Sequence, residues 1–225
     1  MRFLDRLKTV RGCPLFHATS DDGRVLILSP VGFKFCLPPE VSVPVPESLR
    51  LRVPCRKQHI SAIIDVVKEI HDLEVVHRDL KIGNIFAVPD PECAAEAPSQ
   101  SSFAGSHVLV NDLGCATDLN SSASFAGTLH FASDDALIAA TNQATKVWKR
   151  SDDLVSILKF AFILSTNSST FSAMKQADSP DSVLKFWQQC LPLAWLSVID
   201  LAKTVDSDSS ESSYNAFRTA LLRLL

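Results

Sequence analysis

The chain lacks the features that mark several common protein classes. Its six cysteines are scattered and form no C-x-x-C pair, which argues against a zinc site and against a compact disulfide scaffold. It has no basic excess, because 22 Lys and Arg stand against 25 Asp and Glu, and this balance argues against a general nucleic-acid binder. Buried free thiols in a reducing compartment are therefore expected.

Long hydrophobic segments are also absent. The longest apolar run, 154–164, is interrupted by Lys159 and is too short to span a bilayer. The N-terminal sequence MRFLDRLKTVRG interleaves charged and apolar residues and contains no signal-peptide core. Hydrophobic residues make up 46% of the chain and charged residues 21%, the balance of a soluble globular protein. We therefore expect an intracellular location, cytoplasmic or nuclear, and no membrane partner.

Apolar patterns predict the secondary structure of the first half. Residues 24–28 form a short apolar run that predicts a buried strand. Between 58 and 73, isoleucine and valine recur at helical spacing and predict an amphipathic helix. Two strand-like runs follow, at 84–88 and 107–110. The Pro-, Ala- and Ser-rich segment 89–106 between them predicts a long hairpin insertion.

The second half of the sequence predicts helices. Ser151, followed by two aspartates, predicts an N-cap with acids in the first helical turn. The helix behind it, through Leu164, is apolar on nearly all sides and should be central. A polar stretch, 165–181, separates this helix from helical patterns at 183–203 and 214–225.

Two motifs carry the chemistry of the sequence. HRDLKIGN, at 77–84, comes directly after the helical pattern and directly before a strand, and DLG, at 112–114, closes the second strand. They resemble the catalytic loop H-R-D-L-x-x-x-N and the metal motif D-F-G of the protein kinase superfamily, with Leu113 in place of phenylalanine. Both motifs occur in order and in the expected local context, which chance does not readily produce. The resemblance implies an α+β, protein-kinase-like fold with a mostly helical large lobe and a truncated small β lobe.

The resemblance implies chemical roles for four polar residues. Asp79 would be the catalytic base that accepts the proton of a substrate hydroxyl, and Lys81 would meet the γ-phosphate and indicates serine/threonine substrates. Asn84 and Asp112 would bind Mg²⁺, because amide and carboxylate oxygens are the hard ligands that this ion prefers. ATP and Mg²⁺ are thus the implied cofactors, and a protein with a Ser or Thr hydroxyl is the implied partner. Taken singly, each of the four would more often be a solvated surface group.

The resemblance also implies supporting roles. His77 would pack beneath the metal motif. Arg78 would pair with a phosphate on the activation segment, although an ordinary exposed arginine is the alternative. Thr128 lies in GTLHFASD, at 127–134, which resembles the end of that segment. Asp153, in a D-x-x-S pattern, would brace the catalytic loop from the central helix.

One ion pair is implied by the same segment. Asp134 occupies the position of the glutamate in the kinase A-P-E motif, although the proline of that motif is replaced by Ser133. In the family this acid pairs with a buried arginine late in the chain. Arg218 is the candidate for that arginine.

The end of the first predicted strand resembles the kinase hinge, where adenine binds backbone groups. If Leu28 guards the pocket, the carbonyl of Ser29 and the amide of Val31 face the base, with Pro30 between them because it has no N–H. Phe86 would then form an apolar floor under adenine. A surface β-turn would show a similar sequence, so this alternative remains open.

Two parts of a kinase are missing from the sequence. No G-x-G-x-x-G motif occurs, and Lys8 lies too close to the hinge to be the strand lysine that contacts the phosphates. The chain therefore divides into a remnant of the small lobe with the hinge, 1–32, and the large lobe, 33–225. It is either a serine/threonine kinase domain, an ATP-dependent phosphotransferase of impaired activity, or a pseudokinase-like protein-binding module without turnover. A small-molecule phosphotransferase is a distant third, because its catalytic loop would lack Arg78 and Lys81.

Overall fold

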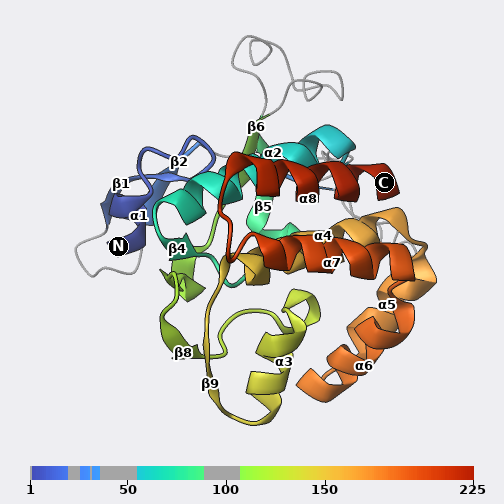
Figure 1. The fold of residues 1–225 in the computed structure, drawn as a ribbon. Coiled ribbons are helices and arrows are strands. Elements are labelled where there is room, and N and C mark those ends of the chain that lie inside the picture. Colours follow the sequence, from blue (N-terminus) through green and yellow to red (C-terminus); the bar gives the residue numbers. More distant parts are fainter. Residues whose placement is uncertain (1, 20–25, 31, 36–54, 89–106) are drawn as a thin grey trace, which may run out of the picture.

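The computed structural model describes residues 2–19, 26–30, 32–35, 55–88 and 107–225 (Figure 1). The hinge residue Val31 and the predicted insertion 89–106 lie outside the described residues. In chain order the helices and strands are α1 (Arg2–Arg6), β1 (Leu15–Thr19), β2 (Leu26–Ser29), β3 (Phe33–Lys34), α2 (Lys57–Asp72), β4 (Val75–Val76), β5 (Ile85–Val88), β6 (His107–Val110), β7 (Thr117–Asp118), β8 (Ser122–Ser124), α3 (Asp134–Thr141), β9 (Thr145–Val147), α4 (Arg150–Ser165), α5 (Ser168–Gln176), α6 (Pro180–Cys190), α7 (Leu193–Thr204) and α8 (Glu211–Leu224).

The N-terminal residues form a short helix and a two-stranded antiparallel sheet. Strand β2 contains the described part of the strand predicted at 24–28, and it pairs with β1, which the sequence pattern did not predict. Helix α1 is fastened to the rest of the chain because Arg2 and Arg6 each lie 2.7 Å from a carboxylate oxygen of Asp118. Leu7 follows α1 and is fully buried, so this segment contributes to the core.

The predicted hairpin is present and determines where the two motifs meet. β5 and β6 pair antiparallel with Ile85 opposite Val110, and β3 pairs with β5 as well. In an antiparallel hairpin, the residue before the first strand and the residue after the second lie at the same end. The motif at 77–84 runs into β5 and the motif at 112–114 follows β6, so the pairing brings the two motifs together.

Two helices form the centre of the helical part, as the sequence predicted. α2 covers the predicted helix at 58–73 and buries one apolar face. In α4, every residue from Ser151 to Ile163 is buried. α2 packs on α4 and α8, and α4 also packs on α7, so α4 has neighbours on several sides (Figure 1).

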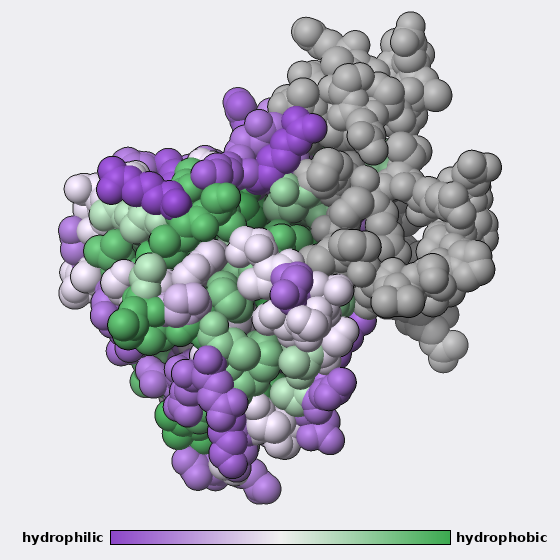
Figure 2. Space-filling model, turned by 90° about the vertical axis from the view of Figure 1, so that its right-hand side faces the viewer, coloured by the Kyte–Doolittle hydropathy of each residue, from purple (hydrophilic) through white to green (hydrophobic). Residues whose placement is uncertain are grey.

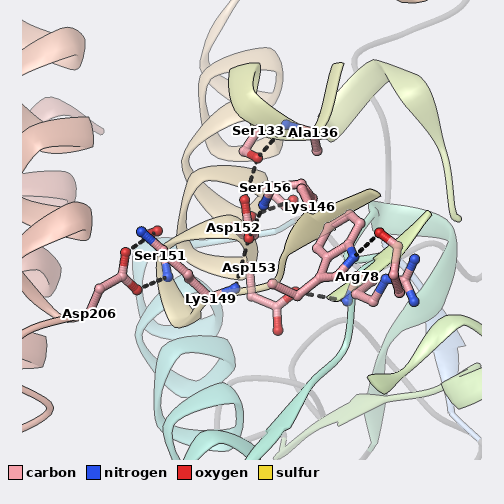
Figure 3. Close-up of polar contacts among 12 residues, drawn as sticks. Arg78, Ser133, Ala136, Lys146, Lys149, Ser151, Asp152, Asp153, Ser156 and Asp206 are labelled. Carbon is pink, nitrogen blue, oxygen red and sulfur yellow. Dashed lines mark hydrogen bonds and ion pairs between the residues drawn. The ribbon is translucent and has the colours of Figure 1, made fainter. Parts of the chain in front are cut away.

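The start of α4 differs from the prediction. The helix begins at Arg150 with Lys149 as its N-cap, so Ser151 lies in the first turn rather than at the cap. Asp152 stabilises the helix start, because its Oδ2 accepts a hydrogen bond from the backbone amide of Lys149 at 2.9 Å. The hydroxyl of Ser151 instead donates to Asp206 at 2.6 Å (Figure 3). Tertiary packing, rather than the local serine, thus fixes the boundary.

Two further helix predictions need correction. The polar stretch 165–181 contains a helix, α5, which begins after the N-cap Asn167, whose side chain accepts from the amide of Thr170 at 3.1 Å. Two buried apolar side chains hold α5 against the core. The pattern at 183–203 is divided into α6 and α7, because Pro192 has no N–H and ends the run of helical hydrogen bonds.

Helix length, the surface and the thiols bear on what else the chain could bind. Across the described ranges, no helix has both the length and the apolar character needed to cross a membrane. Figure 2 shows a face on which apolar residues gather between polar margins. The cysteines of the described ranges are free, and burial raises the pKa of Cys13 to about 12, so this thiol is not a ready nucleophile.

Candidate active site

The catalytic-loop motif, 77–84, is held by the central helix. The carboxylate of Asp153 in α4 accepts a hydrogen bond from the backbone amide of His77 at 2.7 Å. It also accepts one from the backbone amide of Arg78 at 2.9 Å (Figure 3). Arg78 has a φ of 70°, a left-handed conformation that is unfavourable for any residue other than glycine. The two hydrogen bonds hold the loop in this turn, and the contact predicted for Asp153 is confirmed.

Asp153 is supported by two residues that sequence reasoning missed. The Nε2 atom of His71 lies 3.0 Å from Oδ2 of Asp153, and the Nδ1 atom of His71 lies 2.7 Å from the hydroxyl of Tyr214. Burial raises the pKa of Asp153, but its contacts with His71 and His77 outweigh burial and hold the pKa below its ordinary value. The carboxylate is therefore ionised at neutral pH inside the core.

Asp79 lies at the centre of a hydrogen-bond cluster. Its Oδ1 accepts from the backbone amide of Thr128 at 2.7 Å, and its Oδ2 accepts from Nζ of Lys81 at 2.8 Å and from Nδ2 of Asn84 at 3.0 Å. Burial raises the pKa of Asp79, but the hydrogen bonds from Lys81 and Thr128 outweigh burial and hold the pKa below its ordinary value. Asp79 is thus a pre-oriented, ionised carboxylate.

Thr128 connects segment 112–134, the activation segment of the family resemblance, to the catalytic loop. Nζ of Lys81 donates to Oγ1 of Thr128 at 2.7 Å, in addition to its bond with Asp79. The residue before Thr128 must be glycine, because Gly127 has a φ of 110° and a Cβ there would lie 2.6 Å from the carbonyl oxygen of Arg78. The close approach of two backbones explains why the motif contains Gly-Thr.

His77 links the catalytic loop to the metal motif. Its Nδ1 accepts from the amide of Asp79 at 3.3 Å, so Nε2 is the nitrogen left to donate to the carbonyl of Asn111 at 2.9 Å. His77 is fully buried, and Asn111 immediately precedes Asp112. The histidine therefore lies against the metal motif, where the sequence predicted it.

Asn84 and Asp112 could hold a divalent cation. The backbone amide of Asn111 donates to the carbonyl of Asn84 at 2.8 Å, which places the two motifs side by side. The side-chain nitrogen of Asn84 donates to Asp79, so its amide oxygen is the atom left for a metal. Asp112 is exposed and has a left-handed φ of 65°. Within the described ranges no group of three or more His, Cys, Asp or Glu side chains could hold a metal ion.

A cavity of about 500 Å³ opens beside these residues. One part of its wall is apolar and the other polar, and the lining residues are Phe3, Leu4, Leu28, Gly83, Asn84, Phe86, Asn111, Asp112, Leu113 and Gly114. The volume lies within the range of about 300–1,000 Å³ for small-molecule sites. The apolar part of the wall lies next to the side chains of Asn84 and Asp112, so the cavity could hold a ligand with an apolar part and a charged part.

The predicted hinge residues are only partly in this cavity. Leu28 and Phe86 line it. Ser29 follows Leu28 at the end of β2 but is not part of the wall, and its hydroxyl lies 2.5 Å from Nε2 of His17. The contribution of the Ser29 carbonyl to adenine binding stays a prediction, as does that of Val31.

The ion pair predicted between Asp134 and Arg218 is wrong, because Asp134 pairs with a different cation. Asp134 pairs with Lys159, whose Nζ lies 2.9 Å from Oδ1 and also donates to the carbonyl of Ala132 at 2.6 Å. Arg218 instead pairs with Asp65. The reason is position: Lys159 is a fully buried residue of α4, directly beneath the end of the activation segment, whereas the side chain of Arg218 is 18% exposed.

The comparisons with known proteins support the fold. No family model matches the sequence, and no curated protein matches it. The structure is similar to the solved structure of the Cydia pomonella granulovirus kinase PK-1, with a TM-score of 0.58 and 16% sequence identity. The similarity covers 96% of this chain and 76% of that chain. The chain has a protein-kinase-like fold.

Within this kinase-like fold, the residues that the motifs singled out form one site. Asp79, Lys81, Asn84 and Thr128 are joined by direct hydrogen bonds, and Asp112 lines the same cavity as Asn84. The supporting residues that sequence reasoning missed are His71, Lys159 and Tyr214. A lysine inside the apolar helix 154–164 was the one visible signal among them. The similarity at this identity establishes the fold and not the activity.

Proposed function

We propose that the chain is a serine/threonine protein-kinase-like domain that transfers the γ-phosphate of ATP to a protein hydroxyl. The observation that carries the proposal is the meeting of Asp79, Asn84 and Asp112 at one end of the β5–β6 hairpin, beside a cavity of nucleotide size. Phosphoryl transfer requires mainly positioning and charge neutralisation. A protein that only binds partners has no physical need for all three groups.

In the proposed reaction Asp79 orients the substrate hydroxyl and accepts its proton. Among the described residues, Oδ2 accepts from two side chains and Oδ1 from one amide, so Oδ1 has a lone pair left for the hydroxyl. The lowered pKa of Asp79 keeps the carboxylate ionised but makes it a weak base. Proton transfer from the substrate hydroxyl to Asp79 should therefore occur late in the reaction. A late transfer suits the loose transition state of phosphoryl transfer.

Lys81 and the metal-binding pair would neutralise charge on the phosphates. Lys81 donates two of its three N–H groups to Asp79 and Thr128, and the third is left for the γ-phosphate. Mg²⁺ would be held by the amide oxygen of Asn84 and a carboxylate oxygen of Asp112, and when bound it supplies neutralisation of the phosphate charge. The apolar residues Leu28 and Phe86 would contact the base of ATP.

A second candidate function is a pseudokinase-like protein-binding module without turnover. The specific observation that favours it is that no lysine or arginine lines the cavity in the described part of the chain. Nothing in that wall would cover or clamp the phosphates. The proposal therefore retains the division into a small-lobe remnant, 1–32, and a large lobe, 33–225, and expects slow or absent turnover. An intracellular location belongs to the same proposal.

The experiment measures nucleotide binding and phosphate transfer separately. Thermal unfolding is followed with ATP, with and without Mg²⁺, and transfer of labelled phosphate is followed on a mixture of Ser/Thr peptides. At ten times the Kd, a ligand stabilises by about 1.4 kcal/mol, roughly 3–6 °C for a chain of this length. Asp79→Asn and Asp112→Asn are the test variants, and Asp200→Asn, an exposed residue of α7, is the matched control.

The outcomes distinguish the candidates. We expect weak, Mg²⁺-dependent binding that Asp112→Asn abolishes, and slow transfer that Asp79→Asn abolishes but Asp200→Asn retains. Mg²⁺-dependent binding without any transfer favours the second candidate. Binding that is the same in Asp112→Asn as in the unsubstituted chain contradicts the assignment of the metal site.

A further inference from the structure

Trp148 is a buried residue that lies against the activation segment, 112–134, and that the proposed reaction does not use. It follows strand β9, which pairs with β8 of the segment so that Val147 lies opposite Ser122. The backbone of Trp148 continues this pairing, because its carbonyl accepts from the amide of Asn120 at 2.9 Å and its amide donates to the carbonyl of Ser121 at 3.0 Å. Its side chain is enclosed, with 2% of the residue exposed.

The side chain of Trp148 works together with Arg78 of the catalytic loop. Nε1 of Trp148 donates to the carbonyl of Ala123 at 3.2 Å, and Nη2 of Arg78 donates to the next carbonyl, that of Ser124. The guanidinium carbon of Arg78 lies 4.2 Å from the centroid of the Trp148 ring, within the range of a cation–π contact. A stacked indole and guanidinium thus hold two consecutive carbonyls of the segment.

The charges around this pair leave Arg78 without an acidic partner. Lys146 also lies over the ring of Trp148, at 4.4 Å, but it forms an ion pair with Asp152 at 2.5 Å (Figure 3). Arg78 forms no ion pair with any described residue, and its Nε is buried without a hydrogen-bond partner. The ring face of Trp148 and one carbonyl are therefore the groups in direct contact with the guanidinium.

In the sequence-based expectation, a phosphate on the segment would compensate Arg78. Two serines of β8, Ser122 and Ser124, are exposed and are the hydroxyls of that strand that a phosphate could occupy. In the structure Arg78 contacts the ring of Trp148 and the carbonyl of Ser124, and these contacts already connect the loop to the segment. The segment then continues to Thr128, whose amide donates to Asp79 at 2.7 Å.

We propose that Trp148 is a positioning residue that, together with Arg78, fixes the activation segment against the catalytic loop without a phosphate on that segment. The inference rests on the proposed function, because it concerns how Thr128 is brought to Asp79. It adds that the segment of the unmodified chain is already in the arrangement that the reaction needs.

The experiment uses hydrogen exchange of the phosphatase-treated full chain, whose intact mass shows that no phosphate remains. Exchange is followed by mass spectrometry in peptides that cover 117–128. Trp148→Leu removes both the ring face and the N–H donor, whereas Trp148→Phe retains a ring face. Trp195→Leu is the matched control, since Trp195 is a buried tryptophan of α7 that packs on Phe162.

We expect slow exchange in the unsubstituted chain and exchange faster by on the order of tenfold in Trp148→Leu, as the loss of a desolvated cation–π contact predicts. Trp148→Phe should recover most of the protection, and Trp195→Leu should not selectively affect this segment. Where transfer is measurable, Trp148→Leu should lower kcat and leave the KM for ATP unchanged. A purely structural role of Trp148 would not lower kcat while leaving the KM for ATP unchanged.

Two results would overturn the inference. One is a phosphate-free chain whose segment already exchanges as fast as that of Trp148→Leu. The other is protection that develops only after phosphorylation of Ser122 or Ser124. The hydrogen-exchange test is independent of catalysis. A protected segment without any transfer would favour the second candidate function and leave this inference standing, whereas transfer with an unprotected segment would count against this inference alone.

Discussion

Replacing Asp153 by alanine removes the group that holds the catalytic loop. The carboxylate is enclosed in the core, with 1% of its side chain exposed, and it accepts from the amides of His77 and Arg78 and from the ring of His71. The substitution leaves these donors without an acceptor. It also removes the contact that keeps Arg78 at a φ of 70°.

The expected loss in the free energy of unfolding follows from these contacts. An unsatisfied buried donor costs about 1–3 kcal/mol, so three donors give an upper range of roughly 3–9 kcal/mol. Relaxation of Arg78 from its left-handed conformation returns about 1–2 kcal/mol. We therefore expect Asp153→Ala to lower the free energy of unfolding by about 3–5 kcal/mol, the range for breaking a buried charged pair. Asp153→Asn keeps one acceptor oxygen and should cost roughly 2 kcal/mol.

Urea unfolding followed by circular dichroism measures both variants. A loss near 5 kcal/mol is comparable with the whole stability of many domains, about 5–15 kcal/mol, so Asp153→Asn gives the usable value if the alanine variant does not fold. Asp200→Asn is the surface control and should stay within about 0.5 kcal/mol of the unsubstituted chain. The reasoning is refuted if Asp153→Asn is indistinguishable from Asp200→Asn.

The same prediction has a pH dependence. The pKa of Asp153 is lower in the folded chain than in the unfolded chain, so its contribution to stability is fully present above the unfolded value of about 3.9. That contribution is lost as the pH falls through the folded-state pKa, because the protonated side chain no longer attracts its donors. The difference in stability between the unsubstituted chain and Asp153→Asn should be largest at neutral pH and should shrink in acid.

Two further pairs of substitutions test other contacts of the structure. Gly127→Ala should cost about 1–3 kcal/mol and abolish transfer, because the new Cβ would meet the Arg78 carbonyl at 2.6 Å. Gly83→Ala is its control in the same urea assay, since a Cβ there meets only the Lys81 side chain, at 3.8 Å. Lys159→Met should cost about 1–3 kcal/mol in urea, because the Ala132 carbonyl and Asp134 lose their donor. Arg218→Ala should cost less than about 1 kcal/mol, as for a surface ion pair, and an equal loss in both variants would contradict the corrected pairing.

The sequence alone was sufficient for the elements whose signals are local. Helix α2, the central helix α4 and the β5–β6 hairpin all follow from apolar spacing within one segment. The candidate site residues Asp79, Lys81 and Asn84 are close in sequence, so their spacing and the hairpin that follows place them together. Asp112 joins them because it follows the other strand of the same hairpin.

Helix boundaries were less predictable, because they depend on neighbours outside the helix. Ser151 has the chemistry of an N-cap, but its amide and hydroxyl bind Asp206, 55 residues further along the chain. Helix α5 has a local N-cap at Asn167, yet few apolar residues, and its anchoring depends on packing against the core. Sequence spacing cannot show which distant carboxylate or apolar surface will be within reach.

The tertiary structure alone decided which groups support the site. Tyr214 is 143 residues from His71, which it contacts, and Asp153 is 76 residues from His77. The motif pattern identified Asp153, but nothing in the local sequence marks Tyr214 or Trp148 as partners of the catalytic loop. Lys159 rather than Arg218 binds Asp134 because the packing of α4 beneath the activation segment buries one cation there, while Arg218 lies in α8 beside Asp65. A charge can be assigned from the sequence, but its partner depends on which helices pack against each other.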